Sequence, residues 1–387
     1  MIPPLVLALL LACRLPAFGQ SSRAELIAQQ QAEKAAHLAP EVATAAEIVE
    51  KRILSSPLLA GSGGVYPWFG SVYSGTGFAV GAGVLHRAPL ASRLTATAAI
   101  STNGSLSGDL AWRLPTFAVN GRFQPWVEAG VSRLRRLQTW GVGSDVQVTD
   151  RTNVDFRPTR VDAGVTIDAA PGVSLVAGYG YLGFSTAGNP GAAGPLPGLG
   201  ASLDYGVGHV GAVLDWRPSP GFSTNGGFLR GEWRRYAARD AAPFSFDQFE
   251  VEAAELVPFV REQFGLAFRA LATTTRTDTG DDVPFVLLPA VGGGETVRSL
   301  PTRRYRDRSR VVLTGEYRWR PSRYLDMALF LDAGAVGPTL SDIPDRPFRT
   351  GYGIGARVHG PTFTALRLEL AHGREGFRFV ITGGQPF

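Results

Sequence analysis

Residues 310–320 read RVVLTGEYRWR, and this stretch alternates two kinds of side chain at every second position. One set is apolar or small, whereas the other set includes Glu316, Arg318 and Arg320. Because successive side chains of a β-strand point to opposite faces, the pattern predicts a strand with one apolar and one charged face. The charged face is too polar for the core of a soluble protein.

The same alternation recurs along residues 65–387, which can be divided into sixteen such segments. Each strand with its connection then takes about 20 residues, which suits a membrane barrel whose strands have about ten residues. We therefore predict an all-β fold, a transmembrane antiparallel β-barrel of about 16 strands, and a count of 14 also fits. The segments begin near Val65, Thr76, Arg93, Leu106, Pro125, Val161, Val173, Tyr205, Phe228, Phe249, Phe264, Arg310, Leu325, Arg349, Phe363 and Phe377.

Alternation alone does not distinguish a membrane barrel from a soluble β-sandwich. The polar faces carry Gly, Thr, Asp, Glu and Arg, which fits a hydrated lumen. The end of the chain, with Phe377, Phe379 and Ile381 alternating toward Phe387, resembles the C-terminal signal of bacterial outer-membrane barrels. The apolar faces often end in aromatic side chains, which fits the girdles of a membrane barrel: Trp112, Tyr179, Tyr181, Trp216, Trp233, Tyr317 and Trp319.

The N-terminal residues predict export. Residues 5–12 form an apolar run and Ala17-Phe18-Gly19 a small-residue cleavage site, so residues 1–19 are expected to be a signal peptide. The only cysteine, Cys13, lies in this region, and a lipid attached to Cys13 is the alternative. We expect the protein in the bacterial outer membrane.

Residues 20–64 have a different composition, rich in Ala, Gln and Glu, which predicts a short periplasmic segment with helices and a linker. The barrel is then expected over residues 65–387. A helical bundle is excluded because Gly and Pro number 48 and 27 among 387 residues. The net charge of +5 comes without a basic stripe interleaved with aromatics, so we expect no nucleic-acid partner.

A long interruption separates the eleventh from the twelfth segment. Residues 283–310 read VPFVLLPAVGGGETVRSLPTRRYRDRSR. This stretch resembles the sixth extracellular loop of the BamA/TamA-like outer-membrane assembly factors, also called the bacterial surface antigen family. The matching pieces are Leu288-Pro289, Gly292-Gly293-Gly294, Val297-Arg298-Ser299-Leu300, Tyr305-Arg306-Asp307, Glu316-Tyr317-Arg318 and Phe330-Leu331-Asp332-Ala333-Gly334.

The resemblance implies that this loop folds back into the lumen and that its motif arginine meets acids of the inner wall. That role falls on Arg298, with Asp332 and Glu316 as partners, and the alternation itself puts both acids on lumen-facing positions. The family has glycine where this chain has Ser299, and an aromatic residue where it has Leu300. Its periplasmic POTRA domains have no counterpart here, which puts the housekeeping role in doubt.

The function implied is to assist the insertion or translocation of proteins or lipids at the outer membrane, through lateral opening between the first and last strands. The partners would be outer-membrane lipids, unfolded outer-membrane protein clients and a separate periplasmic protein. A passive channel or structural barrel, and a surface receptor or adhesin, remain alternatives.

We expect no metal, because the five histidines have no ligand spacing. We expect no enzyme activity, because no pairing of a Ser with a nearby His stands out, and we expect no cofactor. The basic run at residues 303–310 is expected to be a solvated loop that also touches anionic lipopolysaccharide.

Overall fold

The computed structural model describes residues 64–73, 75–88, 92–116, 121–239, 241–260, 262–360 and 364–382. The chain divides into two compact units, 1–56 and 57–387, and every described strand belongs to the second. The predicted signal peptide with Cys13, the predicted helical segment up to residue 63, and the terminal Phe387 lie outside the described residues.

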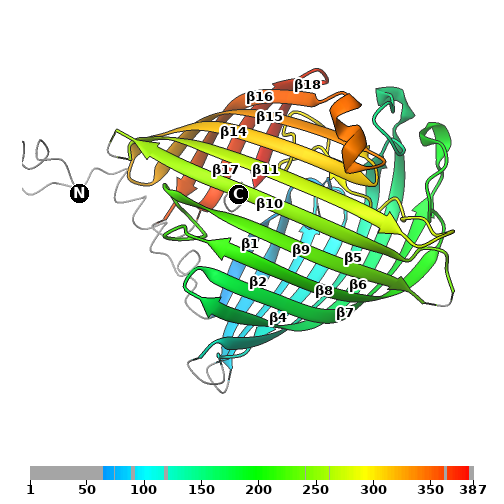
Figure 1. Ribbon diagram of the computed structural model, residues 1–387, viewed down its shortest axis with the longest axis horizontal. Coiled ribbons are helices and arrows are strands. Elements are labelled where there is room, and N and C mark those ends of the chain that lie inside the picture. The colour runs from blue at the N-terminus through cyan, green and yellow to red at the C-terminus, as the bar shows by residue number, and fades with distance from the viewer. Residues whose placement is uncertain are drawn as a thin grey trace, which may run out of the picture. The chain divides into compact units, whose positions relative to one another are not determined.

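Sixteen strands form one antiparallel sheet that curls into a barrel, which confirms the predicted fold (Figure 1). Neighbours in sequence are neighbours in the sheet, except that a long loop separates β11 from β14. The strands are β1 (Gly64–Gly70), β2 (Ala79–Ala88), β3 (Ser92–Ser101), β4 (Leu106–Arg113), β5 (Phe123–Thr139), β6 (Thr152–Ala170), β7 (Val173–Gly188), β8 (Ser202–Asp215), β9 (Gly226–Ala238), β10 (Phe246–Phe259), β11 (Phe264–Thr277), β14 (Ser309–Ser322), β15 (Leu325–Gly337), β16 (Arg349–His359), β17 (Thr364–Gly373) and β18 (Gly376–Thr382).

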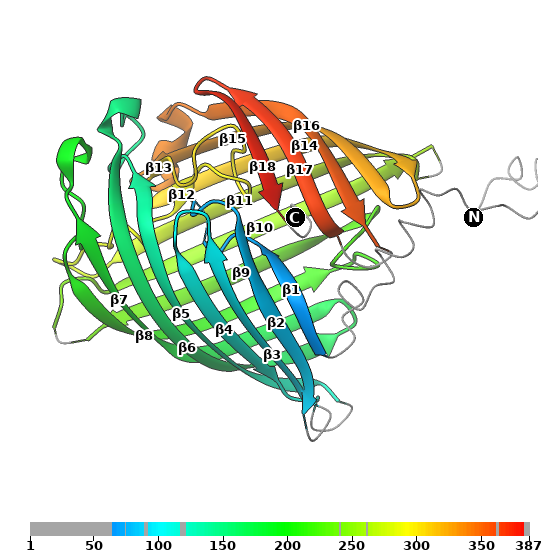
Figure 2. The same cartoon turned by 180° about the vertical axis from the view of Figure 1, so that it is seen from behind.

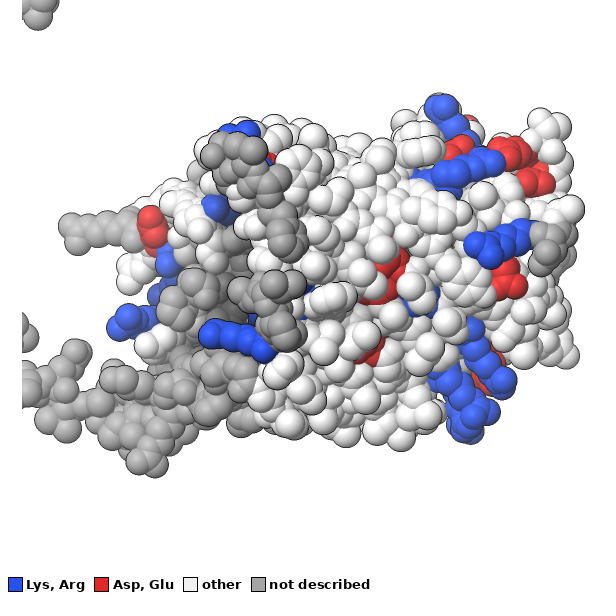
Figure 3. Space-filling model, turned by 90° about the horizontal axis from the view of Figure 1, so that it is seen from below, with Lys and Arg blue, Asp and Glu red and all other residues white. Residues whose placement is uncertain are grey.

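The two faces of the wall differ as the alternation predicts. On β14 and β15, Leu313, Leu329 and Leu331 are exposed on the outside, whereas Glu316 and Asp332 are buried on the inside. Figure 3 shows a broad, mostly uncharged belt on the face that it draws, with charged side chains gathered mainly at the end that carries the long loops. Such a belt is what a bilayer requires of a barrel exterior.

Several strands are longer than the predicted ten residues. β6 has 19 residues and begins at Thr152, nine residues before the predicted Val161. In its first part the pattern is inverted, because Val154 and Phe156 are buried inside while the intervening positions carry Asn153, Asp155 and Arg157. A strand section beyond the bilayer faces water outside, so the membrane pattern that located the other strands does not apply there.

The sheet order ends at β1 and β18, and among the described residues no pair joins these two strands. We call the opening between them the seam. In the described part of the chain, each of these strands has seven residues. In β2, next to the seam, Gly83 lies under the ring of Tyr66, where a Cβ atom would come within 2.2 Å of the ring. This glycine therefore provides room for an inward aromatic side chain.

Helical structure is sparse in the described part of the chain. It consists of the short 3₁₀ turns η2 (Val148–Asp150), η3 (Gly191–Ala193) and η4 (Leu340–Asp345) in the long loops. None of the described helices is long and apolar enough to cross a membrane.

Candidate functional site in the barrel lumen

The loop between β11 and β14 folds into the barrel instead of projecting from it. Two short strands that were not predicted, β12 (Ala290–Val291) and β13 (Tyr305–Arg306), pair with each other and make the loop a narrow hairpin, seen within the barrel in Figure 2. Gly292 and Gly293 have φ values of 121° and 102°, a region that side chains other than glycine rarely adopt, and they begin the turn at the tip. We call residues 278–308 the lumen loop.

Arg298 lies at the tip of the lumen loop and is 2% exposed. Its Nε and Nη2 atoms donate to the two oxygens of Asp332 at 2.8 and 2.7 Å, and its backbone N–H donates to the same carboxylate at 3.0 Å. Nη1 donates to Glu316 at 2.7 Å and to Glu369 at 2.8 Å, and the guanidinium lies 3.5 Å from the ring centre of Phe330. Three carboxylates from three strands therefore surround one arginine.

These contacts raise the pKa of the buried Arg298. Burial alone would lower the pKa of Arg298, but the hydrogen bonds of Asp332 and the negative charges of Glu316 and Glu369 raise it above its ordinary value. The guanidinium is thus held in its charged form. In the part of the chain that the structure describes, no group of three or more His, Cys, Asp or Glu side chains could hold a metal ion.

A second layer of arginines neutralises the acids. Arg357 and Arg318 donate to Glu316 at 2.8 Å, and Arg367 lies 3.2 Å from Glu369. Arg367 also donates to the hydroxyl of Thr382 on β18 at 2.8 Å and to the carbonyl of Gly294 in the lumen loop at 2.9 Å. We call Arg298, these three acids and these three arginines the lumen ion cluster, which connects the loop tip to the last strand of the barrel.

Ser299 fills a notch in the wall. The Cβ atom that Gly351 lacks would come within 2.1 Å of the Ser299 hydroxyl oxygen, and that of Gly373 within 2.5 Å. Ser299 is 1% exposed and its hydroxyl lies 3.5 Å from the carbonyl of Thr350. The side chain of Ser299 needs space that a glycine at this position would not need. Gly351 on β16 and Gly373 on β17 provide that space, because neither has a side chain.

Val297 and Leu300 hold the loop by apolar contacts. Both are buried in a cluster with residues of the hairpin and of the wall. A Cβ atom on Gly334 would come within 3.0 Å of Val297, so β15 also provides room for the loop. The members of the cluster are Leu271, Val291, Val297, Leu300, Tyr305, Val312 and Val336.

The structure thus brings Arg298 together with Asp332 and Glu316. The sequence reasoning missed Glu369 as the third acid, although it alternates with Leu368 and Leu370 and so was placed on the lumen face. It also missed the contact of Arg298 with Phe330. Neither follows from the motif, because both depend on how strands far apart in sequence close around the loop.

The expectation that the basic run is a solvated loop is wrong. Arg304 and Arg306 are 1% and 4% exposed, and Arg304 pairs with Glu375 at 2.8 Å. Arg310 lies on β14 and pairs with Glu250 at 3.1 Å. The run turns inward because the hairpin places its second strand inside the barrel.

Comparison with known proteins shows similarity to a family of outer-membrane barrels. Residues 208–387, which include the lumen loop and all its partners in the ion cluster, match the Omp85 superfamily domain. This chain carries an Omp85 superfamily domain. Among curated protein sequences no significant match is found.

Solved structures share the fold of this barrel at low sequence identity. BamA from Haemophilus ducreyi lacking POTRA domains 1–3 has a TM-score of 0.62 and 15% identity over 84% of this chain and 70% of that chain. CdiB from Acinetobacter baumannii and from Escherichia coli have TM-scores of 0.54 and 0.55, with 12% and 13% identity over 83% of this chain. This chain spans 58% and 59% of the two CdiB chains. The protein is an outer-membrane β-barrel, in which the long loops are extracellular and the short turns periplasmic.

The extracellular end of this barrel is filled by an apolar cap. Phe285 of the lumen loop packs among inward aromatics of β6, β7, β8 and β10. Tyr236 and Phe246 stack with ring centres 4.5 Å apart. The buried members are Leu134, Leu137, Val154, Phe156, Phe184, Leu196, Leu203, Tyr205, Tyr236, Phe246, Val283, Phe285, Val286 and Leu288.

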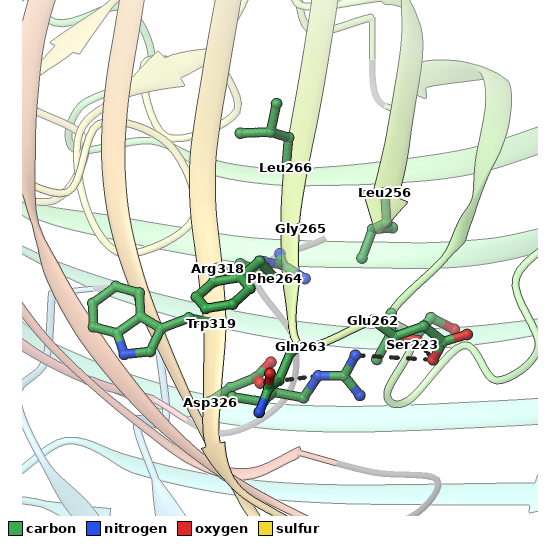
Figure 4. A pocket seen from close by; sticks show the side chains of 12 residues that line it. Ser223, Leu256, Glu262, Gln263, Phe264, Gly265, Leu266, Arg318, Trp319 and Asp326 are labelled. Carbon is green, nitrogen blue, oxygen red and sulfur yellow. Dashed lines mark hydrogen bonds and ion pairs between the residues drawn. The ribbon is translucent and has the colours of Figure 1, made fainter. Parts of the chain in front are cut away.

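On the periplasmic side, the connection between β8 and β9 (residues 216–225) extends across the lumen. Phe222 stacks on His359 of β16 with ring centres 3.6 Å apart, and the carbonyl of Gly221 accepts a hydrogen bond from Thr364 of β17. Figure 4 shows Ser223 of this connection beside Glu262 of the β10–β11 turn, near Asp326. We call residues 216–225 the crossing turn, because it contacts β16 and β17, which lie six and seven places from β8 in the sheet.

Replacing Arg298 by alanine should destabilise the barrel strongly. Three buried carboxylates would lose their shared cation. Removing one partner of a buried ion pair lowers the free energy of unfolding by about 3–5 kcal/mol. We would measure the free energy of unfolding in lipid vesicles by urea titration. The matched control is Arg308→Ala in the same loop, because the Arg308–Asp282 pair is partly exposed and should contribute at most about 1 kcal/mol. Equal losses in both variants would contradict a special role for the cluster.

The Ser299 notch predicts a coupled pair of substitutions. Gly351→Ala should destabilise by about 1–3 kcal/mol, because its new methyl group would overlap the Ser299 hydroxyl. Adding Ser299→Gly should restore most of this loss, giving a coupling free energy of about 1 kcal/mol or more. Gly315→Ala is the control, since the nearest atom to its Cβ lies 4.0 Å away. Additive effects of the two substitutions would show that Ser299 does not occupy the notch.

Phe222→Ala should loosen the crossing turn. An aromatic pair of this kind contributes about 0.5–1.5 kcal/mol, so the released turn should be populated roughly two- to tenfold more. Single-channel recordings in planar bilayers should then show more frequent openings. Leu340→Ala, an exposed change in an extracellular loop, should leave the recordings unchanged. Identical traces for Phe222→Ala and the unmodified chain would mean that the turn does not obstruct the lumen.

Proposed function

We propose that this barrel assists the insertion of unfolded β-barrel proteins into the outer membrane through the seam. The observation that carries the proposal is that β1 and β18 end the sheet without pairing with each other among the described residues. A strand edge in this state has backbone N–H and C=O groups free to pair with an incoming strand. The resemblance to assembly factors in the lumen loop supports the same function.

The side chains around the seam suit a client that enters the bilayer. Phe69 of β1 and Phe379 and Ile381 of β18 are exposed on the outer face. A client strand that pairs with either edge would therefore have its apolar side chains directly in lipid. A separate periplasmic protein would deliver the client.

The lumen ion cluster connects the lumen loop to β18, one edge of the seam. Arg298 contacts Glu369, Glu369 contacts Arg367, and Arg367 donates to Thr382 on β18. The charged contacts thus connect the loop tip to the strand that a client would displace or extend. Loss of Arg298 should weaken this hold and with it the rate of insertion.

The alternative functions have less support in this geometry. A passive channel needs an open lumen, whereas here the lumen loop, the apolar cap and the crossing turn occupy it. A surface receptor that binds its ligand through the basic run needs these arginines on the outer surface, but the run lies inside the barrel, where Arg304 pairs with Glu375.

The test closes the seam chemically. In a Cys13→Ser background, Phe69→Cys and Phe379→Cys would be joined by a bismaleimide reagent, and the chain would be placed in lipid vesicles. The folding of a small urea-denatured barrel protein would be timed with the unmodified chain, the cross-linked variant, Arg298→Ala and empty vesicles. We expect acceleration by the unmodified chain, and none after cross-linking.

Each single-cysteine variant treated with the same reagent is the control and should keep the activity. A gel mobility shift between heated and unheated samples would show that every variant is folded. If the cross-linked barrel accelerates client folding as well as the open one, insertion through the seam is ruled out.

A further inference from the structure

A cavity of about 770 Å³ lies between β1 and β18, on the inner side of the seam. Its walls come from β1, the β1–β2 connection, the tip of the lumen loop and β18. Phe69, Phe379 and Ile381 line the cavity and are also exposed on the lipid-facing surface. The cavity is therefore bordered by the bilayer at the seam.

The charge in this cavity is unbalanced. Three arginines line it, Arg303, Arg306 and Arg378, against a single carboxylate, that of Glu295. Within the described ranges, none of the three arginines forms an ion pair with a carboxylate. This distinguishes them from Arg304, Arg308 and Arg310, each of which has an acidic partner.

Two residues that line the cavity each have one buried polar atom without a hydrogen-bond partner among the described residues. Arg306 is 4% exposed and donates only to the carbonyls of Phe285 and Arg303, while its Nε has no acceptor in the structure. The hydroxyl of Thr139, a residue 1% exposed, has no hydrogen-bond partner either. Arg303 meets the hydroxyl of Tyr73. The residues that carry these donors line a space large enough to hold a ligand.

Burial of these cations without a counter-charge is unfavourable. Loss of water lowers the pKa of Arg303 to about 9, with the positive charges of Arg306 and Arg310 adding to the effect, and burial lowers that of Arg306 to about 10. Both guanidinium groups stay protonated at neutral pH. A buried cation is compensated only by an anion that also fills its hydrogen bonds.

We propose that the seam cavity binds the phosphate-bearing head group of a lipid from the outer leaflet. The planar guanidinium matches the oxygens of a phosphate in geometry, which favours this anion. The cavity lies toward the extracellular end, because it contains the β1–β2 connection and Arg378 near the start of β18. The open seam lets the acyl chains stay in the bilayer beside Phe69 and Phe379. The proposal does not depend on client insertion.

The experiment measures lipid retention by native mass spectrometry. The full chain would be assembled into phosphatidylcholine nanodiscs that contain either diphosphoryl lipid A or the same lipid without its phosphates. We expect about one diphosphoryl lipid A per chain and at least tenfold less of the phosphate-free lipid. Arg303→Gln combined with Arg306→Gln should reduce retention at least tenfold.

Two variants make the result interpretable. Arg308→Gln, in the same loop but paired with Asp282 outside the cavity, should retain lipid A like the unmodified chain. Arg378→Gln, on the opposite wall, should reduce retention even if the double variant does not fold. Equal retention by Arg378→Gln and the unmodified chain would overturn the proposal, as would equal retention of the phosphate-free lipid. Displacement of lipid A by millimolar inorganic phosphate would assign the site to a free anion instead of a lipid.

Discussion

A strand that crosses a bilayer must have its backbone N–H and C=O groups paired, because hydrocarbon offers no hydrogen bonds. In this barrel that requirement is met between fifteen successive pairs of strands, from β1–β2 to β17–β18. At the seam, the described residues of β1 and β18 do not pair with each other. The seam is thus the one place in the described sheet where the membrane environment itself favours the arrival of another strand. The lumen loop, the wall glycines and the lipid-facing aromatics can all be understood in relation to this opening.

The second constraint is the cost of charge inside the barrel. Arg298 could not remain buried without carboxylates, and these carboxylates could not remain buried without the second layer of arginines. The cluster spreads over β14, β15, β16 and β17 and reaches β18. A buried ionic network stabilises a fold no more than well-packed apolar side chains of the same volume would. Its hydrogen bonds are satisfied in only one geometry, however, so the network fixes the position of the loop tip.

The seam cavity differs from the ion cluster in this respect. In the cluster every arginine contacts a carboxylate, whereas Arg303, Arg306 and Arg378 line the cavity and form no ion pair with any described carboxylate. The same loop therefore carries two kinds of arginine site, one internally satisfied and one that needs an outside anion.

The number of strands and most of their starting residues could be predicted from the sequence, for a physical reason. A strand with lipid on one side and water on the other has a period of two that is hard to mistake, so most strands begin within three residues of their predicted starts. β6 was placed nine residues too late because its first part lies outside the bilayer, where the pattern inverts. The loop motif led to Arg298, Asp332 and Glu316, but Glu369, the Ser299 notch and the crossing turn depend on strand register. The contact of Phe222 with His359, for example, joins residues far apart in the chain and leaves no local signal.

The lumen ion cluster also sets an order of events in folding. Arg298 and Glu369 are separated by 71 positions in the chain, and the outer arginine of the cluster reaches Thr382 at the end of the last described strand. Contacts between such distant residues form late, after the intervening chain has been arranged. The loop tip can contact Asp332 and Glu316 earlier, but it completes its set of contacts only when β17 and β18 are in the wall. A chain that lacks β17 and β18 would therefore leave Arg298 without Glu369 and remove the contact between Arg367 and Thr382, so the full set of contacts marks the completion of the protein's own barrel.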